Sequence, residues 1–124
     1  MDIKDYETAK TNKNGVNVKI KAHILDEESM KAAGFRHVVG DGEFWSYFKD
    51  LGSDIEFHVK IPVRGELQID VLDEWYCQPY DYQYMIHSKA THKLPYEVFE
   101  RVEEEMRRLK DFGILEGHEY GEYI

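Results

Sequence analysis

The chain has 124 residues, of which 42% are apolar and 33% charged, and its formal charge is −9. The length suits one domain with one core, and the net negative charge opposes binding to the phosphates of nucleic acids and to anionic membrane surfaces. The single cysteine, Cys77, excludes a disulfide within the chain.

The first part of the chain predicts a lead-in, a strand and a short helix. Residues 1–15 show little periodicity and end in a turn signal, so we expect a frayed, flexible start. Apolar and polar residues alternate over 16–24, which is typical of a half-buried strand. Asp26 is a good helix N-cap and Gly34 a good stop, which predicts a helix over about 26–33.

Residues 35–39 and 43–48 predict two further strands, joined by a tight Gly-Asp-Gly turn over 40–42. The second of these strands carries bulky aromatic residues at both even and odd positions. Because successive side chains of a strand point to opposite faces, this strand is expected to be covered on both sides or to line a groove.

Residues 55–61 and 67–71 alternate apolar with polar side chains and predict a hairpin. A slip of one residue would turn the apolar side chains of one strand to water, so apolar must face apolar. This places Ile61 opposite Leu67 and leaves a three-residue loop. Gly65 then falls where such loops need a left-handed residue.

The last part of the chain predicts a strand over 80–86 and a long helix over about 95–112. Pro95 suits the first helical turn, and Gly113 ends the helix. One face of the helix carries an apolar stripe made of Val98, Phe99, Val102, Met106 and Leu109. The other face carries Glu–Arg pairs spaced four residues apart, which are Glu97–Arg101, Glu103–Arg107 and Glu104–Arg108.

These elements predict a two-layer α+β fold in a single domain over 1–124. Its sheet is an antiparallel, meander-like arrangement of four to five strands. The short helix and the long C-terminal amphipathic helix, about 95–112, are expected to pack on one face of it.

The predicted register also places His58 opposite Asp70, on the polar face of the hairpin. A carboxylate beside an imidazole orients the ring and raises its basicity, as in the general-base pair of a hydrolase. The structural interpretation is favoured, since opposite charges across a strand pair stabilise a sheet by roughly 0.2–1 kcal/mol and no nucleophile or oxyanion donor is evident nearby in the sequence.

A second candidate is an aromatic segment, which comprises Trp75, Tyr76, Tyr80, Tyr82 and Tyr84. Tryptophan and tyrosine give a large contact area with a polar tip, and they gather at binding sites. Acidic residues between them suit cationic groups. The alternative is that the alternating tyrosines form one face of a strand packed on the core.

Familiar catalytic and cofactor motifs are absent from the sequence, which predicts no cofactor and no metal site. The phosphate-binding loop, the dinucleotide fingerprint and the serine elbow have no match. His87 and His92 could hold a metal only if they converged with Asp81 or Glu97. Cys77 lacks a basic neighbour in sequence that would activate its thiol.

The sequence therefore favours a small acidic protein-interaction module without catalytic activity, in general character like short acidic proteins of bacteria and phages. Its expected partner is a protein, or a second copy of the chain, and neither nucleic acid nor membrane. A cytoplasmic location is expected from the single cysteine and the polar start. The alternatives are a small hydrolase that uses His58 and Asp70, and an inhibitor whose acidic surface mimics nucleic acid.

Overall fold

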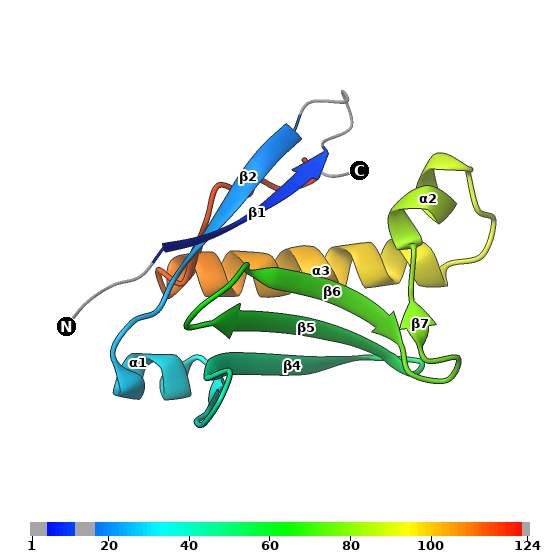
Figure 1. The fold of residues 1–124 in the computed structure, drawn as a ribbon. Coiled ribbons are helices and arrows are strands. Elements are labelled where there is room, and N and C mark those ends of the chain that lie inside the picture. Colours follow the sequence, from blue (N-terminus) through cyan, green and yellow to red (C-terminus); the bar gives the residue numbers. More distant parts are fainter. Residues whose placement is uncertain (1–4, 12–16, 123–124) are drawn as a thin grey trace.

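The computed structural model describes residues 5–11 and 17–122, and within this part three helices accompany two antiparallel sheets (Figure 1). The smaller sheet has the order β1-β2-β8, and the larger has the order β3-β4-β5-β6-β7. The strands are β1 Asp5–Thr11, β2 Asn17–His23, β3 Arg36–Val38, β4 Phe44–Gly52, β5 Ile55–Pro62, β6 Gln68–Asp73, β7 Gln78–Pro79 and β8 Leu115–Glu116. The helices are α1 Glu27–Ala32, α2 Tyr82–His87 and α3 Leu94–Asp111. The predicted α+β class and the meander are confirmed.

The core lies between the larger sheet and α3, which runs along one face of β4, β5 and β6 (Figure 1). Buried and partly buried residues alternate along the whole of β5, and Phe57 and Val59 are fully buried. Val98 and Leu109 of the predicted helical stripe are also fully buried. No helix of the described part covers the other face, which we call the open face (Figure 1). The period-two and helical patterns therefore predicted the correct layers.

The predicted hairpin register is confirmed. In the structure His58 pairs with Asp70, and the ladder continues to Lys60 and Gln68. One further step in the same register joins Ile61 to Leu67, whose exposed fractions are 0% and 2%.

The short helix α1 begins as predicted, because the Asp26 side chain accepts a hydrogen bond from the backbone N–H of Ser29 at 3.0 Å. The hydrogen bond with the Ser29 side chain, and then this backbone bond, lower the pKa of Asp26 below its ordinary value. The chain leaves the helix through Gly34, whose φ is +102°, a conformation that favours glycine. An added Cβ at Gly34 would lie 2.9 Å from the Tyr47 ring, so a bare backbone is needed there.

Two of the expectations for local structure are wrong. Asp5–Thr11, expected to be part of a frayed lead-in, forms β1 and pairs with β2. The remainder of the predicted lead-in, residues 1–4 and 12–15, lies outside the described residues, as does Val16 of the predicted strand. The segment 80–86 is not a strand, because most of it forms α2, which the Asp81 side chain caps by accepting from the Tyr84 N–H at 3.4 Å.

Gly117 is expected to be the least replaceable glycine where the chain returns to β2. Its φ is +89°, and an added Cβ would lie 2.5 Å from the backbone oxygen of Lys19. Gly113 has a similar φ of +84° with nothing within 4 Å of that position. We expect Gly113→Ala to lower the free energy of unfolding by about 1 kcal/mol through backbone strain alone. Gly117→Ala should cost roughly 1–2 kcal/mol more because of the overlap. Urea titration of both variants would check this difference, and equal losses would contradict the close approach.

Candidate functional site

The sequence-predicted pair His58 and Asp70 lies on the open face, within a row of polar side chains on neighbouring strands. The Oγ of Ser46, on β4, lies 3.2 Å from Nε2 of His58. Burial lowers the pKa of His58 below its ordinary value, and the negative charge of Asp70 opposes this shift. Within the described residues no hydrogen bond joins His58 to Asp70. The row thus resembles a serine–histidine–aspartate arrangement in composition but lacks its second hydrogen bond.

The exposure of Ser46 distinguishes a catalytic role of this row from a structural one. Its side chain is only 4% exposed. The ring of Phe48 stacks on the imidazole of His58, with centroids 4.1 Å apart, while Phe48 itself is 55% exposed. A nucleophile must reach its substrate, and this hydroxyl lies beneath its neighbours. The geometry therefore favours a structural cross-strand row over the hydrolase hypothesis.

The predicted aromatic segment divides between surface and core. Trp75, Tyr76 and Tyr84 are 74%, 70% and 68% exposed. Tyr82 is buried in the core, and Tyr80 packs against it with partial burial. The segment is therefore neither one binding face nor one packed strand face, because it passes from a tight turn through β7 into α2.

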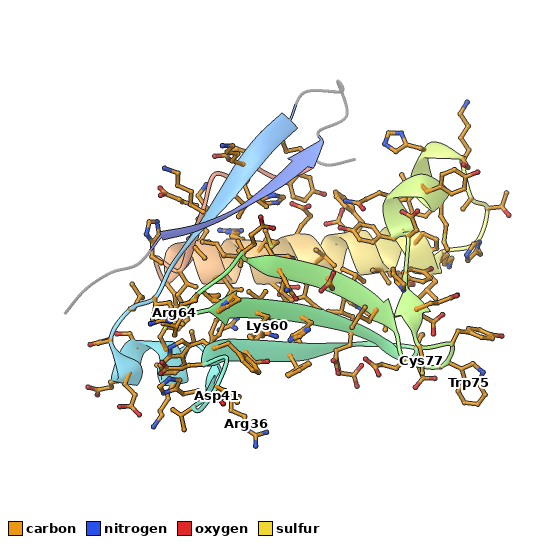
Figure 2. The ribbon with its side chains drawn as sticks, in the orientation of Figure 1. Arg36, Asp41, Lys60, Arg64, Trp75 and Cys77 are labelled. Carbon is orange, nitrogen blue, oxygen red and sulfur yellow. The ribbon has the colours of Figure 1, made fainter. Side chains whose placement is uncertain are left out.

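The turn between β6 and β7 holds two of these aromatic residues at one end of the larger sheet. The carboxylate of Asp73 accepts hydrogen bonds from the backbone N–H groups of Trp75 and Tyr76, at 3.0 and 3.2 Å. Cys77 closes the turn with a φ of +51°. Figure 2 shows Trp75 and Cys77 at this end of the sheet, with Trp75 directed away from the core. The backbone of the turn is fixed, while the two aromatic side chains stay in solvent.

Several carboxylates lie at the same end of the sheet as these aromatic side chains. Glu74 N–H donates to the backbone oxygen of Asp54 at 2.8 Å, which joins the β6–β7 turn to the β4–β5 turn. The register pairs Asp50 with Glu56 across β4 and β5. We call this region the acidic aromatic end, and it comprises Asp50, Asp54, Glu56, Asp73, Glu74, Trp75 and Tyr76. Such a surface attracts cations through both carboxylate charge and aromatic ring faces.

Burial raises the pKa of Glu56, and the neighbouring carboxylates of Glu74 and Asp50 raise it further. A raised folded-state pKa favours folding below the ordinary value of 4.5, and this contribution is lost as the pH rises through the folded-state pKa. At neutral pH the ionised Glu56 therefore destabilises the fold.

We expect Glu56→Gln to stabilise the chain at pH 7 by about 0.5 kcal/mol, the size of one cross-strand charge effect. This corresponds to a rise of about 2 °C in Tm, and the gain should vanish near pH 4. Thermal unfolding at both pH values checks the sign. Glu66→Gln, at an exposed position in the β5–β6 turn, is the control and should leave Tm unchanged. A fall in Tm for Glu56→Gln at pH 7 would contradict the crowding.

A cavity of about 200 Å³ lies on the other side of the larger sheet, between the edge of β6, α2 and α3. Its wall includes a buried pair that sequence reasoning missed. Nε2 of His118 lies 2.8 Å from Oε2 of Glu103, and the two residues are 8% and 6% exposed. Because a carboxylate only accepts hydrogen bonds, Nε2 carries the proton. A usable signal was present, since Glu103 lies four residues after Phe99, on the edge of the apolar stripe.

The residues considered as metal ligands do not gather. His87 and His92 are both exposed. Within the described residues no group of three or more His, Cys, Asp or Glu side chains is arranged to hold a metal ion. The described helices also include none that is both long and apolar enough to cross a membrane.

The geometry thus offers two candidate sites, the acidic aromatic end and the cavity beside His118 and Glu103. Known proteins supply no further guide to either site, because the chain matches no family model, no curated protein and no solved structure.

Proposed function

We propose that this chain is a non-catalytic protein-interaction module that binds a basic segment of a partner protein through its acidic aromatic end. The proposal is carried by one observation, the exposure of the neighbouring residues Trp75 and Tyr76, at 74% and 70%, on a turn with a fixed backbone. Large aromatic side chains are enriched among the residues that dominate binding energy in protein interfaces.

The charge and the aromatic rings of this surface favour a partner with basic side chains. Carboxylates from β4, β5 and β6 lie at this end of the sheet. An arginine in contact with it, Arg101 of α3, donates to the backbone oxygen of Leu51. A lysine or arginine of the partner gains charge attraction from the carboxylates and a cation–π contact from an indole or phenol ring. The net charge of −9 accelerates the encounter with a basic segment at low salt.

The direct test uses a short peptide that alternates arginine with glycine, and a matched peptide in which glutamate replaces arginine. Calorimetry on the full chain should show binding of the basic peptide only. Trp75→Ala should weaken that binding by about 2 kcal/mol, roughly thirtyfold, as expected for a central aromatic residue in an interface.

A matched control is available at the opposite end of the sheet, where Val39 is 72% exposed. Val39→Ala removes a comparably exposed apolar side chain and should leave the affinity unchanged. Glu74→Gln should weaken binding at low salt and much less at high salt, because exposed charges are screened. Equal affinity for the two peptides, or equal losses for Trp75→Ala and Val39→Ala, would contradict the proposed function.

A further inference from the structure

The cavity between β6, α2 and α3 carries an inference separate from the proposed function. Its polar groups are Asp81, Gln83, Glu103, His118 and the tyrosines Tyr80 and Tyr82. Apolar side chains from three elements complete its wall, and they include Ile20 of β2, Ile69 of β6, and Val102 and Met106 of α3. A concave wall in which apolar side chains accompany convergent polar groups is a common form of a small-molecule site.

Two polar groups of the wall are arranged for a ligand. The carboxylate of Glu103 is held in place by His118 at 2.8 Å and by the backbone N–H of Gly121 at 3.3 Å, and both contacts fall on Oε2. Within the described residues Oε1 has no hydrogen-bond partner. The hydroxyl of Tyr80 is buried and likewise lacks a partner among the described residues. Buried polar groups normally find one, so an additional molecule in the cavity would complete the Tyr80 hydroxyl.

The charges of the wall favour a positively charged ligand. Its side chains include carboxylates on α3 and in the loop before α2, a single imidazole, and neither lysine nor arginine among the described residues. Tyr82 and Glu103 both line the cavity. Burial raises the pKa of Tyr82, and the negative charge of Glu103 raises it further. Aromatic rings beside a carboxylate are the surroundings that favour an ammonium group.

The size of the cavity limits the ligand. Water occupies about 30 Å³ per molecule in the liquid, so about 200 Å³ holds about six or seven non-hydrogen atoms. We propose that this cavity binds a small primary amine as its ammonium ion, which donates to Glu103 while its aliphatic part lies against the side chains of β6 and α3.

The test uses n-butylammonium, n-butanol and butyrate, three probes of similar size that differ in charge. Amide shifts of the full ¹⁵N-labelled chain are followed in solution. Butylammonium should give saturable shifts at Tyr82, Glu103 and Gly121 with a Kd of about 1 mM, as befits so small a ligand. Butanol should bind at least tenfold more weakly, and butyrate should not bind.

Three variants make the outcome decisive. Glu103→Gln should weaken butylammonium binding at least tenfold, whereas Glu104→Gln, the next residue on α3 and exposed, should leave it unchanged. If Glu103→Gln fails to fold, Asp81→Asn keeps a helix-capping side chain, removes one charge from the wall and should weaken binding severalfold.

Equal binding of butanol and butylammonium, shifts that do not saturate, or unchanged affinity in the foldable wall variants would overturn the inference. Trp75 does not line this cavity. Trp75→Ala should therefore leave butylammonium binding intact, so the inference and the proposed function fail separately.

Discussion

Phe57→Ala is expected to lower the free energy of unfolding by about 4 kcal/mol, the typical cost of removing a buried aromatic ring. Phe57 is fully buried at the centre of the larger sheet. Its ring packs edge-on against Tyr47, with centroids 6.3 Å apart. Such a loss is a large part of the 5–15 kcal/mol that stabilises a typical domain. Urea titration measures it directly.

The matched control is Phe48→Ala, which removes the same ring from the opposite face of the same sheet. Phe48 is 55% exposed and contacts the imidazole of His58. We expect a loss below about 1 kcal/mol, because half of this ring is already in water and the stacking contact is modest. Similar losses for the two variants would show that the open face is covered, which would contradict the two-layer arrangement.

His118→Ala is expected to cost about 3 kcal/mol at neutral pH. The change leaves the carboxylate of Glu103, only 6% exposed, without the imidazole that now lies 2.8 Å away. Breaking a buried pair by removing one partner leaves an uncompensated buried charge, and this is far more costly than losing a surface pair. The pair also holds the segment after β8 against α3, so local unfolding of this segment is expected in the variant.

A double-mutant cycle separates the pair from its surroundings. Glu103→Ala and the double variant complete the cycle, and the double variant should lose at least 1 kcal/mol less than the sum of the singles. His92→Ala removes an exposed histidine and should change the free energy of unfolding by less than about 0.5 kcal/mol. Additive losses in the cycle would show that the two side chains do not interact.

The sequence was most informative where two constraints acted on the same residues. Along β5 and β6 the period-two pattern fixed the buried face, and the loop geometry fixed the register, so the pairing of His58 with Asp70 could be predicted. The helix α3 was equally clear, because Pro95, the apolar stripe and Gly113 marked its start, its buried face and its end. The acidic aromatic residues were recognised for their type, while their exposure depended on the tertiary structure.

The prediction over 80–86 was wrong because alternation of tyrosines imitates a strand. Only Tyr82 is buried there, and Tyr84 points into solvent. Asp81 offered the competing signal, since aspartate before a short run of residues is a common helix N-cap. The strand β1 was missed for another reason. Its residues pair with β2 through the backbone. Backbone pairing does not require alternating apolar residues, so the sequence carried no pattern that predicts this strand.

The cavity site could not be predicted, because its parts are distant in sequence and ordinary by themselves. Glu103 was interpreted as one half of an exposed pair with Arg107, yet it is buried and bonds to His118. The other arginines of α3 also bond elsewhere. Arg101 donates to the backbone oxygen of Leu51, and Arg108 donates to that of Ala33. Contacts with β4, with the end of α1 and with the C-terminal segment therefore replaced the helical pairs that spacing alone suggested.

The central claim, that the acidic aromatic end binds a basic segment, is tested most directly by mapping the contact. The unlabelled arginine–glycine peptide is titrated into the ¹⁵N-labelled chain. The two indole N–H groups serve as site and reference, since Trp75 is 74% exposed and Trp45 only 5%. We predict saturable shifts at the Trp75 indole and at the amides of residues 73–77, with the Trp45 indole unchanged. Shifts centred on the open face around Phe48 and Lys60, with Trp75 unchanged, would contradict the claim.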